Sequence, residues 1–282
     1  MRKELLKEIL SIPTYFSSEE RIKEFLIKYA NERKITLYQD KKGNLYMIKG
    51  ILDKGEYYPC VLAHMDTVHH EQISLVTNNI KLNIYEDNNA GNPRLWASYK
   101  KYDSENLTGI GGDDKAGIFI CLELLEKYDK IIAAFFVEEE FGCRGSKMVD
   151  TKILENVGYF IQFDAPTNNW CSFSCAGVQL FNEEIFNNIF PILKKYEINN
   201  ISIDPYTDIF ILKKTFNVAC MNFFAGYYNM HRTNEYVLLN DIDKAINFGS
   251  EIIMKLGNKH YNFLSTNKPD MVLYEKIKRL LN

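Results

Sequence analysis

The sequence of 282 residues lacks the long apolar runs that would indicate a membrane protein. No stretch approaches the roughly 18 consecutive apolar residues that a membrane-spanning helix needs. The first residues, MRKELLKEILSIP, carry too many charges for the apolar segment of a signal peptide. An excess of positive charge is also missing, because the net charge is −3. We therefore expect neither nucleic acid nor a membrane as a partner.

The cysteines lack any pattern that indicates a disulfide framework or a structural zinc site. The six cysteines show neither the spacing of a small disulfide-rich domain nor that of a zinc knuckle. Cys60 and Cys121 lie in apolar runs, where small core residues are expected. Cys171 and Cys175 form the closest pair, and a structural zinc would need two more such ligands nearby. The sequence therefore predicts reduced cysteines and a cytoplasmic protein.

Internal repeats and low-complexity linkers are absent, and helical and strand-like patterns alternate along most of the chain. Strands are predicted over residues 36–39, 44–48, 58–62, 131–137, 158–163 and 216–224, and helices over residues 115–127, 145–154, 182–196, 240–256 and 271–281. This alternation is typical of an α/β fold in which helices cover both faces of a mixed, mostly parallel sheet. We expect one three-layer catalytic domain over residues 1–282.

Two helices are predicted before the first strand. The amino-terminal segment carries Leu5, Leu6, Ile9 and Leu10 at helical spacing, which indicates an amphipathic helix. Further along, Ser17 and Glu20 have the spacing of a capping box and predict that a second helix begins there.

The most distinctive stretch is TGIGGDDKAG, residues 108–117, in which two adjacent carboxylates follow a glycine-rich turn. A glycine-rich turn before a helix can bind phosphate through its backbone N–H groups. Here Asp113 and Asp114 would repel a phosphate, and neither the Walker nor the Rossmann spacing is present. A carboxylate at such a turn can instead bridge two cations, so we interpret the stretch as part of a metal site.

Other metal-binding residue types follow strand-like runs elsewhere in the chain, where ligands gather in α/β sheets. The segments are VLAHMDTV with His64 and Asp66, FFVEEEFG with Glu139 and Glu140, IQFDAP with Asp164, and YYNMHRTNEY with His231. The order His-x-Asp, Asp-Asp-Lys, Glu-Glu, Asp, His resembles that of the di-zinc exopeptidases, namely the tripeptidase T, glutamyl aminopeptidase and leucine aminopeptidase families. The resemblance covers about residues 1–260, and its motifs are specific as a set.

The resemblance implies a site for two zinc ions, for which cobalt or manganese could substitute. Asp113 would bridge the two ions, and His64 with Asp164 would complete the first metal. Glu140 and His231 would complete the second metal, because zinc accepts imidazole and carboxylate ligands. The family likeness also implies a cis peptide bond between Asp113 and Asp114.

Two further acids would act in catalysis according to the same resemblance. Glu139 matches the general base, which takes a proton from water and passes it to the leaving amine. Asp66 matches the acid that orients the first histidine, and it lies two residues after His64 on the same side of a strand. The two metals would polarise the scissile carbonyl and lower the pKa of the water.

Some polar residues are predicted to lie outside the site. His69 and His70 match nothing in the family pattern, and His260 is expected to be exposed. Thr207 and Asp208 resemble a Thr-Asp pair of the glutamyl aminopeptidase family, but we assign no metal to them. Each candidate ligand alone would be read as an ordinary surface or turn residue, so the prediction depends on the complete set.

Two insertions that relatives carry are missing here. Residues 69–107 are too few for a separate domain, so we interpret them as a short excursion that could wall the cleft. No separate lid domain fits between Asp164 and His231, and lid-bearing relatives use a lid histidine to hold the oxyanion. Another group must therefore donate this hydrogen bond, and the candidates are Tyr206, Tyr227 and Tyr228.

The resemblance implies a zinc-dependent exopeptidase, and an aminopeptidase that hydrolyses short peptides is the leading hypothesis. The same metal core also serves carboxypeptidases, and amidases or deacylases that act on N-acyl amino acids. In those enzymes the lid usually binds the substrate carboxylate, so the missing lid disfavours them. A non-catalytic metal-binding protein is the third alternative, and the intact Glu139 argues against it. The sequence leaves the oligomeric state open.

Overall fold

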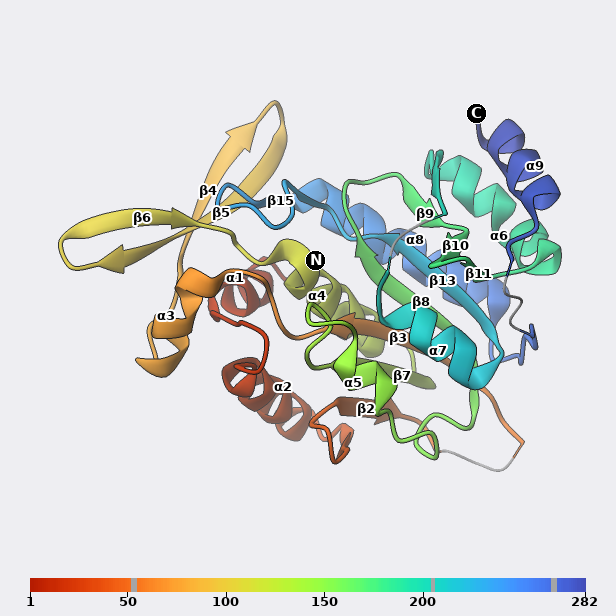
Figure 1. Ribbon diagram of the computed structural model, residues 1–282, viewed down its shortest axis with the longest axis horizontal. Coiled ribbons are helices and arrows are strands. Elements are labelled where there is room, and N and C mark those ends of the chain that lie inside the picture. The colour runs from red at the N-terminus through yellow and green to blue at the C-terminus, as the bar shows by residue number, and fades with distance from the viewer. Residues whose placement is uncertain (52–54, 204–205, 265–267) are drawn as a thin grey trace.

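The computed structural model describes residues 1–51, 55–203, 206–264 and 268–282, and its central element is an eight-stranded sheet (Figure 1). The strand order is β1-β2-β7-β3-β8-β13-β9-β12. In chain order the strands are β1 (Thr36–Gln39), β2 (Leu45–Lys49), β3 (Tyr58–His64), β7 (Ile131–Phe136), β8 (Val157–Ala165), β9 (Trp170–Ser172), β12 (Asn200–Ser202) and β13 (Ala219–Phe224). The four central strands β7, β3, β8 and β13 are parallel, whereas β1, β2 and β9 introduce antiparallel pairs. The predicted mixed, mostly parallel sheet is confirmed.

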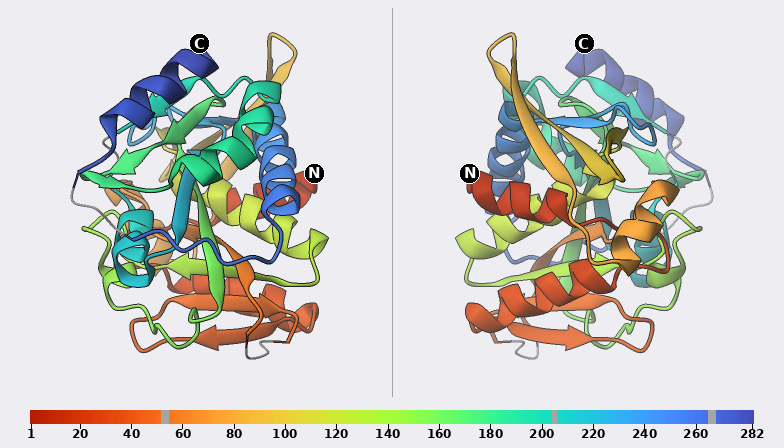
Figure 2. Two further views of the ribbon diagram at one scale, coloured as in Figure 1. Left: turned by 90° about the vertical axis from the view of Figure 1, so that its right-hand side faces the viewer. Right: turned by 90° about the vertical axis from the view of Figure 1, so that its left-hand side faces the viewer.

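Helices cover both faces of this sheet (Figure 2). One face carries α1 (Lys3–Ser11), α2 (Glu20–Glu32), α4 (Gly112–Lys127) and α8 (Leu239–Leu256), with α6 (Glu183–Lys195) beside α8 and α9 (Met271–Leu281) beside α6. The other face carries α5 (Arg144–Lys147) and α7 (Asp208–Phe216). Two consecutive residues of β8 show the division. The Phe163 ring packs against Gly249 of α8, whereas Gln162 accepts a hydrogen bond from the backbone N–H of Ile209 in α7.

The core follows from strands that are apolar throughout. Every residue of β3, β7 and β13 is buried, as expected for strands with helices on both sides. All six cysteines are free and buried. Within the described ranges, no helix combines the length and the apolar character needed to cross a membrane.

Residues 69–108 form an arm that projects from the body (Figure 1). It comprises η1 (His70–Gln72), α3 (Ile73–Thr77), β4 (Asn83–Asn89), β5 (Asn92–Lys101) and β6 (Ser104–Thr108). Strand β5 pairs with β4 along its first part and with β6 along its last part, so two hairpins share one strand. The arm is fixed to the body because β5 also pairs with β15 (Tyr236–Leu238), which pairs with β14 (Tyr227–Tyr228). Residues 95–99 therefore lie within β5, whereas residues 80–82 precede β4.

The helices predicted over residues 115–127, 182–196, 240–256 and 271–281 match α4, α6, α8 and α9 within a few residues. Two other expectations were wrong in extent. The strand predicted to begin at residue 216 begins at Ala219, because the preceding residues form α7. The buried Ile209 and Leu212 of α7 lie on the side of the helix that packs against β8 and β13. The helix predicted over 145–154 is limited to the four residues of α5 and continues as turns.

The predicted capping box is also wrong. Ser17 has a φ of 57°, and its hydroxyl donates to Glu138 Oε1 instead of capping α2. Glu19 occupies the cap position, but its carboxylate Oε1 accepts the backbone N–H groups of Ser17 and Glu138. A contact with a distant loop has therefore replaced the local cap.

Candidate metal centre

Three neighbouring parallel strands deliver most of the candidate residues to one edge of the sheet. His64 is the last residue of β3, and Asp164 is the penultimate residue of β8. Glu139 and Glu140 follow the end of β7, which lies beside β3. Because the carboxyl ends of parallel strands meet at the same edge, side chains far apart in sequence become neighbours.

The two carboxylate oxygens of Asp113 face two different histidines. Oδ1 lies 3.1 Å from Nε2 of His64, and Oδ2 lies 3.2 Å from Nε2 of His231. Asp113 stands at the beginning of α4, whereas His231 lies in the loop between β14 and β15. This arrangement is that of a carboxylate able to bridge two cations.

Each histidine is accompanied by a further carboxylate. His64 Nε2 lies 3.6 Å from Oδ1 of Asp164, and His231 Nε2 lies 3.2 Å from Oε1 of Glu140. In the second group, one ligand atom each from Asp113, Glu140 and His231 lies within 4.8 Å of the others. The structure thus brings together all five residues that the sequence predicted as metal ligands.

Asp114 also lies beside His64 and Asp164, within the same 4.8 Å limit. Its oxygens, however, accept the backbone N–H groups of His64 and Gly117, at 3.2 and 3.0 Å. Burial raises the pKa of this carboxyl well above its usual value, and Asp164 adds to the rise. We therefore interpret Asp114 as the residue that fixes the start of α4 against β3. The peptide bond between Asp113 and Asp114 is cis, as the sequence resemblance implied.

The turn that presents Asp113 is held by Glu235, a residue that the sequence analysis missed. Gly111 has a φ of +69°, a conformation that favours glycine. The buried carboxylate of Glu235 accepts the backbone N–H of Gly111 at 2.7 Å and that of Asp113 at 3.0 Å. Its Oε2 also lies 2.9 Å from Nε2 of His69, at the base of the arm. The only sequence signal was an acid shortly after His231, within a polar stretch that resembles an exposed loop.

Asp66 connects the first histidine to the glutamate loop. Its two carboxylate oxygens accept the backbone N–H groups of Glu139 and Glu140, at 2.9 and 3.0 Å. Oδ1 also lies 3.4 Å from Nδ1 of His64, and the same ring nitrogen lies 3.1 Å from the Asp66 carbonyl oxygen. One buried side chain therefore orients a candidate ligand and the loop that carries the candidate base.

Glu139 is buried at the site, with Oε2 4.0 Å from Nε2 of His64. Burial raises the pKa of its carboxyl well above the usual value, and nearby Asp164 adds to the rise. The Cys143 thiol donates to Oε1 at 3.5 Å. A buried carboxyl with a raised pKa is suited to accept and release a proton.

The histidines and carboxylates shift each other's pKa values strongly. Burial opposes the charge of Asp113, but the two histidines outweigh this effect and lower its pKa. Hydrogen bonds with Asp113 and Glu140 raise the pKa of His231 to about 10. Burial and the neighbouring Asp113 raise the pKa of Asp164 to about 6. The site therefore attracts positive charge.

The donor set fits divalent metal ions. Five carboxylates converge here with only two imidazoles, namely Asp113, Asp114, Glu139, Glu140 and Asp164 with His64 and His231. Even two protonated histidines would leave this cluster with excess negative charge, which is costly to bury without a partner. Glu140 Oε1 is buried, and apart from its 3.2 Å approach to Nε2 of His231 it has no hydrogen-bond partner among the described residues. Imidazole nitrogen and carboxylate oxygen are ligands that zinc accepts.

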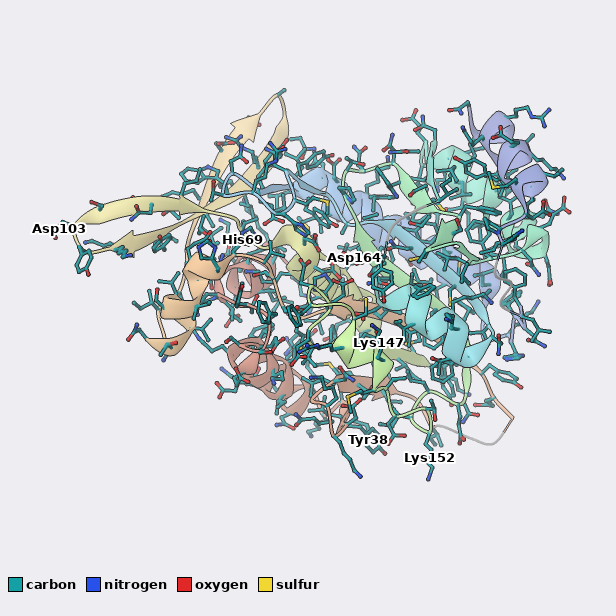
Figure 3. All side chains as sticks on the ribbon, viewed as in Figure 1. Tyr38, His69, Asp103, Lys147, Lys152 and Asp164 are labelled. Carbon is teal, nitrogen blue, oxygen red and sulfur yellow. The ribbon has the colours of Figure 1, made fainter. Side chains whose placement is uncertain are left out.

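A cavity of about 430 Å³ opens onto this cluster. Its described lining includes the metal-site residues, together with apolar and aromatic side chains from the ends of β8, β9 and α7. This lining contains no lysine or arginine, and no residue of the arm. Figure 3 shows Asp164 in the middle of the body and Asp103 at the distant tip of the arm. The expectation that residues 69–107 wall the cleft is therefore wrong for the described lining.

The three candidate tyrosines differ clearly in position. Tyr227 is buried and lines the cavity, with its hydroxyl 3.5 Å from Oδ1 of Asp164. Tyr228 points elsewhere, because its hydroxyl donates to Asp241 at 2.6 Å. Tyr206 lines the cavity farther out and is half-exposed. Only Tyr227 therefore has its hydroxyl beside a candidate ligand.

The remaining predicted residues lie as follows. Thr207 donates to Oδ2 of Asp164 at 2.6 Å, and the buried Asp208 accepts the Ser146 hydroxyl at 2.5 Å. None of the three possible metal clusters among the described residues contains Asp208 or a histidine other than His64 and His231. His260 is exposed as predicted, whereas His69 is buried against Glu235.

Searches against protein-family models and against curated proteins find no match for this chain. Several solved structures share its fold. A tripeptidase from Staphylococcus aureus subsp. aureus Mu50 has a TM-score of 0.65 and 14% identity, over 88% of this chain and 95% of its own. Aminopeptidase PepT from Bacillus cereus ATCC 10987 has a TM-score of 0.64 and 14% identity, over 90% and 97%. A TET aminopeptidase from a marine sediment Thaumarchaeota archaeon has a TM-score of 0.64 and 11% identity, over 89% and 95%. The chain therefore has the fold of these peptidases, as the sequence resemblance to the di-zinc exopeptidases implied.

Proposed function

We propose that this protein is a metal-dependent aminopeptidase that removes the first residue of short peptides. The observation that carries the proposal is the position of Asp113, whose two oxygens face His64 and His231 at one end of a cavity. The fold shared with aminopeptidases agrees with this function.

The six free cysteines support a reducing compartment, and we propose the cytoplasm.

The proposed metals are two zinc ions, for which cobalt or manganese could substitute. His64 and Asp164 would hold one ion, Glu140 and His231 would hold the other, and Asp113 would bridge them. Bound at this site, the ions would polarise the scissile carbonyl and lower the pKa of the attacking water. Asp66 would keep the His64 ring and the glutamate loop in place through its hydrogen bonds.

Glu139 is the proposed general base. Its buried carboxylate would take a proton from the attacking water and then donate that proton to the leaving amine. The raised pKa supports both steps, because the protonated form must be accessible during the reaction. Glu140, the next residue, faces His231 and would serve as a ligand.

Tyr227 is the proposed donor to the oxygen of the scissile carbonyl as negative charge develops there. Within the described part of the chain, its hydroxyl has one long contact, with Asp164 at 3.5 Å, so its proton can be redirected to the substrate. Burial raises its pKa well above the usual value, and Asp113 and Asp164 add to the rise. The hydroxyl therefore keeps its proton and can donate it in a hydrogen bond.

The charge of the cavity supports action at the amino end of a peptide. A substrate ammonium group can donate charge-assisted hydrogen bonds to the site carboxylates. A substrate carboxylate would instead need a cation, and the described lining offers neither lysine nor arginine. We further propose that all 282 residues form one catalytic domain without a lid.

One tripeptide in free, N-acetylated and C-amidated forms tests the proposal. Each form is incubated with the protein and with zinc, cobalt or manganese, and the products are identified by mass spectrometry. We expect removal of the first residue from the free and amidated forms and no cleavage of the acetylated form. Cleavage of the acetylated form with rejection of the amidated form would instead indicate a carboxypeptidase or a deacylase.

A further inference from the structure

We infer that the cavity beside the metal centre selects peptides whose first residue has a large apolar side chain, aliphatic or aromatic. This inference rests on the proposed aminopeptidase function. In such a reaction the α-carbon of the first residue joins the ammonium group to the scissile carbonyl. The first side chain must therefore occupy the space next to the metal cluster, and the cavity of about 430 Å³ is that space.

The cavity wall away from the carboxylates is mostly apolar. It is formed by Ala165 at the end of β8, Pro166, Trp170 at the start of β9, Tyr206 before α7 and Met230 beside His231. Tyr206 is 48% exposed and Met230 is 38% exposed, so both offer apolar surface that a ligand can cover. Covering such surface is favourable roughly in proportion to its area.

The wall is held in place before a ligand binds. The Tyr206 ring packs against Phe210 of α7, with 5.3 Å between the ring centroids. Trp170 is held by the parallel pairing of β9 with β12, where it lies opposite Asn200. Pro166 has little backbone freedom of its own. A preformed apolar wall favours side chains that fill it without the cost of ordering the wall.

Charged side chains are disfavoured for two reasons. An acidic side chain would find no cationic side chain to pair with, because the described lining contains no lysine or arginine. A basic side chain directed at the wall would bury its charge against Trp170, Tyr206 and Met230, none of which carries a carboxylate to pair with it. Thr207, a polar residue of the lining, already donates its hydroxyl to Asp164. The cavity should therefore bind an apolar first side chain more tightly than a charged one.

Two peptide series test the inference. In the series X-Ala-Gly and Ala-X-Gly, X is phenylalanine, leucine, alanine, lysine or glutamate, and kcat/KM is measured for each peptide. With X first, we expect kcat/KM for phenylalanine and leucine to exceed that for alanine by about 10- to 200-fold, the range for apolar pockets. Lysine and glutamate should fall below alanine. With X second, the values should differ much less.

The wall residues are tested with variants. Tyr206→Ala and Met230→Ala should each reduce the ratio of kcat/KM for Phe-Ala-Gly to that for Ala-Ala-Gly. Tyr38→Ala is the matched control, because Tyr38 is also 48% exposed but lies at the far edge of the body on β1 (Figure 3). Calorimetry with the non-hydrolysable amino alcohols L-phenylalaninol and L-alaninol gives an equilibrium readout, in which the wild-type protein should prefer the former.

The outcomes separate this inference from the function on which it rests. Equal turnover of all first residues, preference for a charged first residue, or selection only at the second residue would overturn the inference and leave the aminopeptidase function intact. The same holds if the ratio is unchanged in both wall variants. Failure to cleave any peptide of either series would overturn the proposed function, and this inference with it.

Discussion

The backbone N–H of Asp113 donates to the carboxylate of Glu235, with 3.0 Å between the nitrogen and Oε1. Glu235 is fully buried and has no solvent to satisfy its charge. The carboxylate of Glu235 instead accepts the backbone N–H of Gly111, in the turn that presents Asp113, and contacts the imidazole of His69. The position of the proposed bridging ligand thus depends on a carboxylate that belongs to none of the possible metal clusters among the described residues.

Glu235→Gln should weaken both the fold and metal binding. The amide has one oxygen where the carboxylate has two, so its NH₂ group would face a backbone N–H donor. A buried unpaired donor costs about 1–3 kcal/mol, and loss of a supporting contact lowers metal affinity about 10- to 100-fold. Urea unfolding and zinc titration measure these effects, with the exposed Glu24→Gln as control. Wild-type values in both assays would show that the turn does not depend on Glu235.

Protein purified without chelators should contain two metal ions per chain, as measured by native mass spectrometry. His231→Ala should reduce this number to one, because His64 and Asp164 would still hold the other ion. The His231 side chain is 42% exposed, so its removal should leave the fold intact. One metal per wild-type chain would contradict the dinuclear site.

Glu139→Gln should retain both metals and lose most turnover. The change preserves shape but removes the proton acceptor, and general-base catalysis contributes about 10²- to 10⁴-fold. Metal content and kcat are measured on the same preparation. Turnover near the wild-type rate would mean that another group accepts the proton.

Tyr227→Phe should lower kcat by about 10²- to 10³-fold, the effect of removing one oxyanion donor, with little change in KM. Tyr228→Phe is the matched control, because the Tyr228 hydroxyl donates to Asp241 away from the cavity. The affinity for a phosphinic tripeptide analogue, which mimics the tetrahedral state, should fall by a similar factor. Unchanged kcat in Tyr227→Phe would remove this residue from the mechanism.

Glu19 should make stability depend on pH. Burial, with a contribution from the nearby Asp66, raises the pKa of Glu19 to about 7, from 4.5 in the unfolded chain. Between these values the folded state keeps a proton that the unfolded state has lost, so the stabilisation present below pH 4.5 is lost as the pH rises through 7. By linkage the loss is at most about 3 kcal/mol.

Glu19→Gln tests this dependence. The amide oxygen can still accept the N–H groups of Ser17 and Glu138, both of which donate to Oε1. Urea unfolding at pH 5 and pH 8 should give similar stability for both proteins at pH 5 and a more stable variant at pH 8. A variant that is less stable at pH 8 would show that the charge of Glu19 is favourable.

The proximity of the five proposed ligands could be predicted because their residue types and their order along the chain are visible in the sequence. Glu235 and His69 could not, because each is buried only through a partner 166 residues away in the sequence. The residues of α7 have the apolar and β-branched content of a strand. Packing against β8 and β13 stabilises the helical conformation instead, and this packing is not visible in the local sequence. Ser17 has the local signal of a helix cap, but Glu138, 121 residues away, takes its hydroxyl.

The order in which the ligands occur along the chain has a consequence for synthesis. His64 is made early, whereas His231 follows after most of the chain and is held by the pairing of β15 with β5 of the arm. During translation, amino-terminal segments leave the ribosome first. A nascent chain therefore contains β3, β7 and β8 before it can complete the site. On the proposed function, the nascent peptidase stays inactive until His231 has been made and placed.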